Sequence, residues 1–287
     1  MSGAVCPNCG SSLAHRYCAE CGQAAPGPGD YSLRAHAADL FEQLTSLDGK
    51  AARTIWTLVR RPGLLTADHL AGRRGRYLRP LQLFLVVNVL LFVAAPKTPL
   101  FSYSLANYER FAPPSPALVR SLVARATPVG SGAAEGEYVR AFNDRVETER
   151  KSLILLFAPA LAAVLHLIFR RRGPTDVDSE HVPRQPGEHL VFALHLLSFI
   201  WLVLIGWGAI TALTAWRPLA GLWGIAAAAA VMLLLLAMLV YVFHATRRVY
   251  ALSRMRALAL TAVLAVAFVG LLVAYRAMLF FTTYYTL

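Results

Sequence analysis

Apolar positions divide the chain into a polar N-terminal part and a longer part dominated by uncharged stretches. Residues 81–95 carry no charge, and four longer apolar stretches follow them. A helix of about 20 apolar residues matches the hydrocarbon thickness of a bilayer. The pattern therefore predicts an all-α integral membrane protein whose membrane domain covers residues 80–287. Its five expected transmembrane helices span about 80–95, 152–169, 190–215, 219–245 and 257–275.

Two shorter segments before the first apolar stretch have the spacing of amphipathic helices. One carries Leu33, Ala37 and Leu40 on one face, and the other carries Ile55 and Leu58. Together with a basic, turn-rich collar they form an expected region over residues 32–79. These helices would lie on the membrane surface, pack on the membrane domain or provide the core face of a small soluble domain.

The long segment between the first and second apolar stretches is polar and rich in proline. It covers residues 96–151. Glu and Arg residues spaced for i,i+4 pairing predict a helix from Tyr138 to Leu153 at its end, continuing into the second span.

Composition and charge support a membrane class and indicate an anionic partner. The chain is 57% hydrophobic and 15% charged, whereas soluble domains carry about 25% charge. Its formal net charge is +12, but the arginines flank apolar stretches, which favours anionic lipid over nucleic acid. The collar residues expected to contact lipid phosphates are Arg73, Arg74, Arg76 and Arg79.

The distribution of arginines also predicts an orientation. Besides the collar, the cations that follow the second and fourth spans are Arg170, Arg171, Arg172, Arg184, Arg247, Arg248, Arg254 and Arg256. With five spans, all these clusters fall on one side, which the positive-inside rule makes cytoplasmic. We therefore expect a membrane protein with a cytoplasmic N-terminus, an extracytoplasmic 96–151 loop and an extracytoplasmic C-terminus. No basic segment followed by an apolar one opens the chain, so no cleavable signal peptide is expected.

The four cysteines of the chain form two Cys-x-x-Cys-Gly knuckles near the N-terminus. Each knuckle directs two thiolates at one centre, and Gly10 and Gly22 permit the positive φ of such turns. Two knuckles complete a tetrahedral site, which predicts a structural Zn(II) ribbon over residues 1–24 and a linker over 25–31. A pair of disulfides is the alternative, which a reducing compartment disfavours. The expected metal ligands are Cys6, Cys9, Cys18 and Cys21.

Polar side chains inside apolar helices are candidates for function because lipid does not solvate them. Those within the expected spans or at their ends are Gln82, Asn88, His166, Glu188, His189, His195, Ser198 and His244. The five expected near the cytoplasmic ends of spans two, three and four are His166, Glu188, His189, His195 and His244. Imidazole and carboxylate ligands would suit zinc or iron and metal-assisted hydrolysis. The alternative is ordinary polarity at helix ends, which His195 fits least because it lies deeper.

Several stretches resemble an uncharacterised bacterial membrane-protein family, the domain of unknown function numbered 3667. The most specific of them runs from Arg61-Pro62-Gly63 to Gly72-Arg73-Arg74-Gly75-Arg76-Tyr77. The others are CPNCG, YCAECGQ, RTIWTLVRRPG, GEHLVFALHLLSF and YVFHATRRVY. The resemblance implies an N-terminal zinc ribbon joined to a helical membrane domain, and it implies no activity. Members often have a further polar residue where this chain has Leu196-Leu197, which weakens the placing of His195 in a fixed ligand set.

Three hypotheses for function follow. The first is a binding, scaffold or regulatory protein whose cytoplasmic zinc ribbon contacts a protein partner and is tethered to the bundle. The second is a membrane-embedded metal-dependent hydrolase or metal transporter built on the histidines and Glu188. The third is a small-solute channel or transporter. The closed cysteine site favours a role without catalysis.

Overall fold

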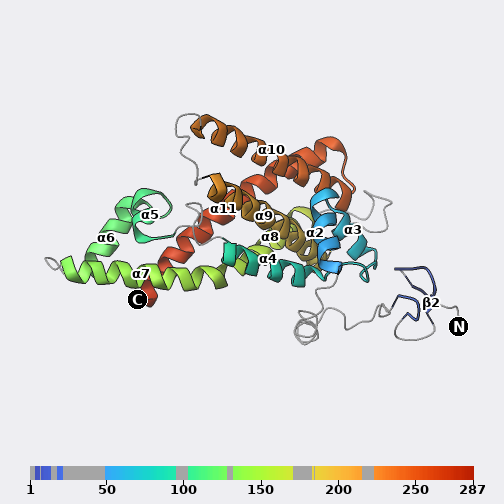
Figure 1. The fold of residues 1–287 in the computed structure, drawn as a ribbon, viewed down its shortest axis with the longest axis horizontal. Helices are drawn as coiled ribbons and strands as arrows, with labels where there is room; N and C mark the ends of the chain where they lie inside the picture. The colour runs from blue at the N-terminus through green and yellow to red at the C-terminus, as the bar shows by residue number, and fades with distance from the viewer. Residues whose placement is uncertain are drawn as a thin grey trace.

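The structure is a computed structural model that describes residues 4–6, 8–13, 18–21, 49–94, 103–127, 132–170, 183, 185–214 and 223–287. Within these ranges the chain is almost entirely helical, as the sequence predicts, with one small antiparallel hairpin. The elements are β1 (Ala4–Val5), β2 (Ser12–Leu13), α2 (Lys50–Arg60), α3 (Leu64–Leu70), α4 (Pro80–Ala94), α5 (Leu105–Arg110), α6 (Pro116–Ala126), α7 (Gly132–Leu153), η2 (Ile154–Leu156), α8 (Phe157–Phe169), α9 (Pro186–Thr214), α10 (Trp223–Val249) and α11 (Arg254–Thr286) (Figure 1). The helix expected around Leu33 and the 25–31 linker lie outside the described residues.

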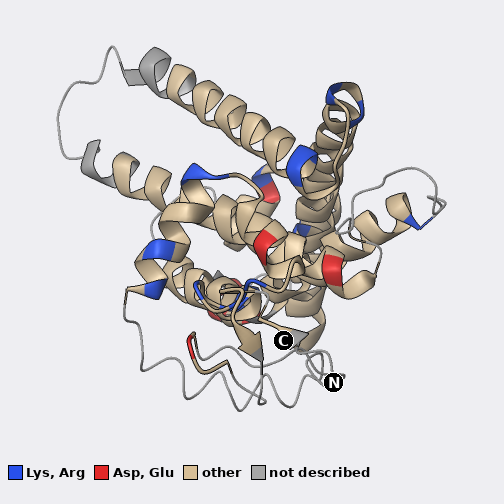
Figure 2. Ribbon diagram, turned by 90° about the vertical axis from the view of Figure 1, so that its right-hand side faces the viewer, with Lys and Arg blue, Asp and Glu red and all other residues tan. Residues whose placement is uncertain are grey.

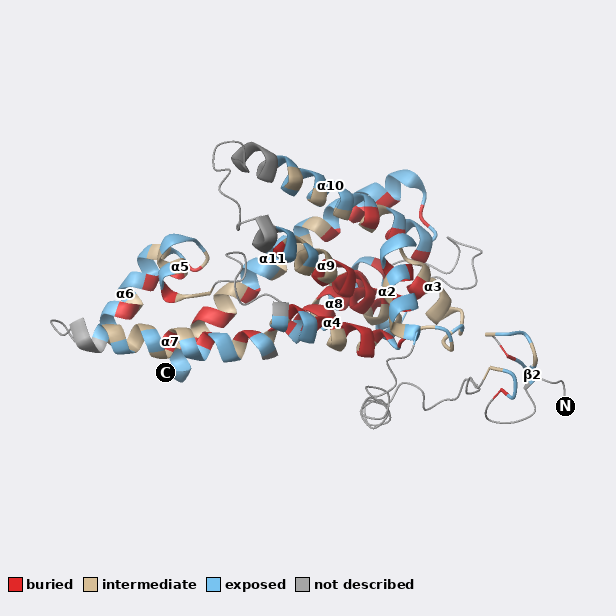
Figure 3. Cartoon of the chain, in the orientation of Figure 1, coloured by how far each residue is buried: buried red, intermediate tan, exposed pale blue. Residues whose placement is uncertain are grey.

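The centre of the bundle is α9, which packs extensively against both α4 and α8. Leu83 and Val87 on α4, Leu165 on α8 and Leu197 on α9 are completely buried. Figure 3 shows that buried residues concentrate in these three helices. A helix that is apolar around its whole circumference belongs inside a protein or a membrane, and α4 is of this kind.

Four helical segments are long and apolar enough to cross a membrane. They are Glu135–Phe169, Pro186–Ile210, Ala229–Val249 and Arg254–Thr286. The first apolar stretch forms α4, whose 15 residues extend about 22 Å at the rise of an α-helix, less than the roughly 30 Å of a hydrocarbon core. The expected count of five spans therefore stays a prediction.

The surface of the last two helices is that of a membrane protein. Val231, Met232 and Leu236 on α10 are exposed, as are Val263 and Val266 on α11. Figure 2 shows most of the long helices without charged residues. Such wide apolar surfaces are rare on soluble monomers, whereas lipid chains accommodate them.

The helix predicted around Ile55 and Leu58 is α2, and it packs on the membrane domain. Its buried face includes Thr54, Thr57 and Leu58. The Tyr241 hydroxyl of α10 donates to the Leu58 carbonyl oxygen at 2.7 Å. The following helix, α3, contacts both α9 and α10. Of the three arrangements that the sequence leaves open for this helix, the structure therefore shows packing on the membrane domain.

The turn between α2 and α3 approaches the end of α10 very closely. Gly63 has a φ of +73°, and a Cβ at this position would lie 2.8 Å from the Ala245 carbonyl oxygen. The Arg248 guanidinium donates to the Pro62 carbonyl oxygen at 2.7 Å. Only glycine combines this backbone conformation with this spacing, so Gly63 lets the turn sit against α10.

The proline-rich segment before α7 folds against the distal half of α11. It contains α5 and α6, which the sequence pattern did not predict, and α7 begins at Gly132 rather than at Tyr138. Tyr108 of α5 is completely buried, with its ring 5.1 Å from that of Phe280. The amide nitrogen of Leu105 donates to the Asn143 side chain of α7 at 2.9 Å. This small helical unit lies at one end of the bundle in Figure 1.

Candidate metal centre and polar clusters of the bundle

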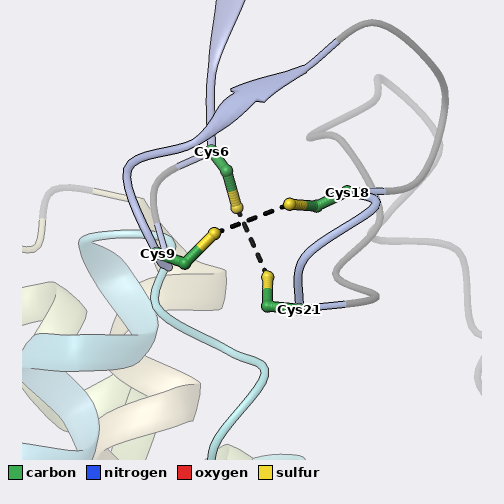
Figure 4. Close-up of side chains that lie close together, drawn as sticks. All are labelled: Cys6, Cys9, Cys18 and Cys21. Carbon is green, nitrogen blue, oxygen red and sulfur yellow. Dashed lines mark hydrogen bonds between the residues drawn. The ribbon is translucent and has the colours of Figure 1, made fainter.

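The four cysteines converge on one point. Their sulfur atoms all lie within 4.8 Å of one another. The Sγ atoms of Cys6 and Cys21 are 3.6 Å apart, and those of Cys9 and Cys18 are 3.5 Å apart (Figure 4). A tetrahedral zinc with Zn–S bonds of about 2.3 Å places its sulfurs about 3.8 Å apart, whereas a disulfide bond is about 2.05 Å long. The four cysteines are thus close enough together to hold one metal ion, and none of them is paired as a disulfide.

The hairpin explains how the first two cysteines reach this geometry. Ala4 pairs with Leu13, and Val5 pairs with Ser12. Cys6 donates its amide hydrogen to Ser11 O at 2.8 Å, and the Gly10 amide donates to Cys6 O at the same distance. Gly10 has a φ of +80°, the conformation expected for the glycine of a knuckle. The second expected glycine, Gly22, lies outside the described residues.

The thiols of Cys6 and Cys18 differ in pKa because their surroundings and hydrogen-bond partners differ. The Ser11 hydroxyl lies 3.1 Å from Cys18 Sγ. This hydroxyl and then the Cys21 amide stabilise the thiolate and lower the pKa of Cys18 to about 6. Although the Cys9 amide acts in the same direction on Cys6, burial and the neighbouring thiols of Cys21 and Cys9 raise the pKa of Cys6 to about 11. At neutral pH Cys18 is thus a thiolate and Cys6 a thiol, so a cation bound by Cys6 would displace its proton.

Of the five residues expected near the cytoplasmic helix ends, His166 and His189 lie together. Their ring centroids are 5.7 Å apart. His189 is completely buried, and its Nδ1 atom lies 3.0 Å from the Tyr250 hydroxyl at the end of α10. Phe169 stacks on the Tyr250 ring at 4.3 Å. An aromatic enclosure thus surrounds the His189 ring.

His195 and His244 have separate surroundings, whereas Glu188 lies within electrostatic range of His189 and Tyr250. His195 is 5% exposed, and its Nδ1 atom lies 2.9 Å from the Thr66 hydroxyl of α3. Glu188 accepts a hydrogen bond from the Gln185 amide at 2.9 Å, at the start of α9. His244 is exposed on α10, with its ring against Phe243. A cavity of about 10 Å³ beside His195 has room for about one water molecule.

The remaining polar candidates inside the bundle are buried. Gln82 and Asn88 are each 2% exposed, and Ser198 is completely buried. Asn88 donates to Phe84 O at 2.7 Å, and Ser198 donates to Leu194 O at 2.7 Å. The side chains of Asn88 and Ser198 thus each donate a hydrogen bond to a carbonyl oxygen of their own helix, which gives them a structural role.

The collar arginines have different surroundings. Arg73 forms an ion pair with Asp68, its Nε atom 2.9 Å from the carboxylate. Arg74 donates to His69 O at 3.4 Å. Arg76 and Arg79 are exposed. The lipid contacts expected of these four residues stay a prediction.

Comparison with known families gives one match. The family described as "Protein of unknown function (DUF3667)" matches residues 48–92. The resemblance expected from the sequence is therefore confirmed for this segment. No curated protein and no solved structure matches the chain.

The DUF3667 match coincides with the docking segment, α2 through most of α4. It contains the Arg61-Pro62-Gly63 turn, whose glycine touches α10, and Thr66, which bonds His195. The sequence reasoning missed Thr66 and Tyr250 as partners of the buried histidines. Tyr250 is the last residue of the YVFHATRRVY stretch. It lies 61 residues from His189, and no sequence pattern predicts contact over such a separation.

Proposed function

We propose that the four cysteines hold a structural zinc ion and that this N-terminal module binds a protein partner. The helical bundle would tether the module to a bacterial inner membrane, giving a scaffold or regulatory role. The observation that carries the proposal is the convergence of four thiols within 4.8 Å. Soft thiolate ligands in a tetrahedral set suit Zn(II).

A site with four thiolates has no coordination position left for a substrate. This favours a module that binds over one that catalyses. Its two strands have only two residues each, so metal binding would supply most of its folding free energy. Val5 is 63% exposed and offers apolar surface for a partner.

The proposed orientation has the N-terminus in the cytoplasm and the C-terminus outside. Arg247 and Arg248 lie at the end of α10, beside the α2–α3 turn, and Arg254 and Arg256 begin α11. This concentration of cations at one end supports a cytoplasmic location for that end. The collar arginines ahead of α4, which are Arg73, Arg74, Arg76 and Arg79, would contact anionic lipid phosphates there.

The proposal is tested by metal analysis of the intact purified protein. We expect one sulfur-ligated zinc per chain by X-ray absorption, lost when Cys6 and Cys18 are both replaced by serine. The matched control is Ser12→Ala, which changes the hairpin without touching a thiol. Absence of sulfur-ligated zinc from the wild type, or its retention in the Cys6→Ser/Cys18→Ser variant, would reject the metal centre.

The partner is tested by a photocrosslinking residue at position 5 in living cells. A discrete crosslinked protein that disappears with the Cys6→Ser/Cys18→Ser change would support a zinc-dependent docking module. The same crosslink with and without the cysteines would contradict it.

A further inference from the structure

The inference rests on a pair of buried ring nitrogens between α8 and α9. His189 Nε2 and His166 Nδ1 are both inaccessible to solvent and have no hydrogen-bond partner in the described part of the chain. His189 itself is 0% exposed. Leaving a buried polar atom without a partner is costly, and native proteins rarely do so without an ion, a water or a functional reason. Here two such atoms belong to neighbouring rings 5.7 Å apart.

The spacing of the two rings suits a shared metal ion. Imidazoles that ligate one ion through bonds of about 2.0–2.1 Å have ring centroids roughly 5–6.5 Å apart. The measured 5.7 Å lies inside this range. The planes of the rings are inclined by 58°, so they do not stack, and stacking does not explain their proximity.

The surroundings of His189 are those of a ligand held in place. Its other nitrogen, Nδ1, lies 3.0 Å from the Tyr250 hydroxyl. When Nδ1 carries the proton and the tyrosine oxygen accepts it, Nε2 presents its lone pair. Metal-binding histidines are commonly oriented in this way by a second hydrogen bond. Phe169 and Phe192, both buried, pack their rings on Tyr250 at 4.3 and 5.3 Å and fix the position of its hydroxyl.

We propose that His166 and His189 bind a transition-metal ion, with Tyr250 as the residue that positions His189. Imidazole nitrogens select zinc, copper, nickel or iron over magnesium or calcium. Two protein ligands leave coordination positions open. The site would therefore exchange its ion more readily than the four-cysteine centre does. It is separate from His195, whose Nδ1 atom bonds Thr66, and from the exposed His244.

The test is zinc binding by the full chain, measured by dialysis against Zn²⁺ and metal analysis. We expect two equivalents per chain in the wild type and one in His166→Gln, because His166 is only partly buried and its replacement preserves the fold. His244→Gln is the matched control, since it removes an exposed histidine at the same end of the bundle, and it should keep two. In the Cys6→Ser/Cys18→Ser variant the remaining ion should show only nitrogen and oxygen ligands by X-ray absorption.

Three results would overturn the proposal. One is a single equivalent in the wild type that has only sulfur ligands, which leaves water as the bridge between the rings. Another is two equivalents in His166→Gln, and a third is loss of the second equivalent in His244→Gln, which indicates adventitious surface binding. Thermal unfolding of each variant by circular dichroism separates loss of the ligand from loss of the fold.

The positioning role of Tyr250 has its own readout. Tyr250→Phe keeps the ring stack and removes the hydroxyl, so both equivalents should still bind at saturating Zn²⁺. The affinity of the second should fall about 10–100-fold, as for other outer-shell partners of metal-bound histidines. An unchanged affinity would mean that Tyr250 does not orient the ligand.

Discussion

Gly63 shows how a single residue fixes the docking of one segment on another. It combines a left-handed backbone, φ +73°, with a contact so close that a Cβ would lie 2.8 Å from Ala245 O and 3.2 Å from the Val249 side chain. The carbonyl belongs to helical backbone, so it does not yield as a flexible side chain would. The position is therefore restricted to glycine for two independent reasons.

Replacing Gly63 with alanine should lower the free energy of unfolding by roughly 2–4 kcal/mol, from the strained φ and the overpacking together. Thermal unfolding in detergent, followed by helical circular dichroism, measures the loss. Gly136→Ala is the matched control, because that glycine lies within α7 with nothing near its Cβ position. It should gain about 0.5–1 kcal/mol of helix propensity. Equal effects at the two positions would contradict the proposed contact.

At the scale of elements, Arg276 joins α11 to the turn between α5 and α6. Its guanidinium donates to the carbonyl oxygens of Pro113, Asn107 and Phe111 at 2.9–3.1 Å, and to the Asn107 side chain at 2.9 Å. It also lies 4.3 Å from the centroid of the Tyr108 ring. A planar group with five donors suits such an array, and a lysine ammonium does not.

Arg276→Ala should therefore release α5 and α6 from α11, at a cost of about 2–4 kcal/mol to that unit. Hydrogen exchange should show faster exchange in residues 105–126, with α9 unchanged. Arg276→Lys should rescue little of the protection. The matched control is Arg145→Ala, which removes an exposed pair with Glu149 and should cost less than about 1 kcal/mol. Uniform deprotection of the whole bundle would refute the local role.

Sequence reasoning located the long apolar helices and the cysteine cluster because both signals are local. The sequence did not predict the short helices α3, α5 and α6. The helix α3 lies within an arginine-rich collar, and its Leu65 and Thr66 become buried only against α9 and α10. The helices α5 and α6 of the proline-rich segment were missed for the same reason. Their contacts are with residues about 170 positions later, as when the Tyr108 hydroxyl donates to the Arg276 carbonyl oxygen.

For the buried histidines, too, the sequence did not predict which side chains surround them. Depth along each helix follows from the sequence, but the neighbours of a side chain depend on how the helix is rotated. At 100° per residue, His189 and His195 point in directions that differ by about 120°. One therefore faces Phe169 and Tyr250, and the other faces Thr66. Glu188 shares the helix face of His195, yet it lies about two turns away at the start of α9.

At the scale of the whole molecule, the proposed orientation places the end of α11 outside the cell. Tyr285 is 76% exposed there. In spheroplasts, a membrane-impermeant maleimide should label the Tyr285→Cys variant without permeabilisation and leave the wild type unlabelled, since its four thiols would lie on the cytoplasmic side in this orientation. Labelling of Tyr285→Cys only after permeabilisation would invert the topology.

The contact between Leu58 and Tyr241 links residues 183 positions apart, and it has a consequence for how the protein is made. A ribosome adding about 5–20 residues per second needs on the order of ten seconds or more to reach Tyr241 after finishing α2. Throughout this interval the Leu58 carbonyl oxygen lacks its α10 partner, and α2 has only α3 and, later, α9 to pack against. The amphipathic pattern of α2 suits the bilayer surface. The nascent chain would therefore rest this helix on lipid until α10 is inserted and takes its place.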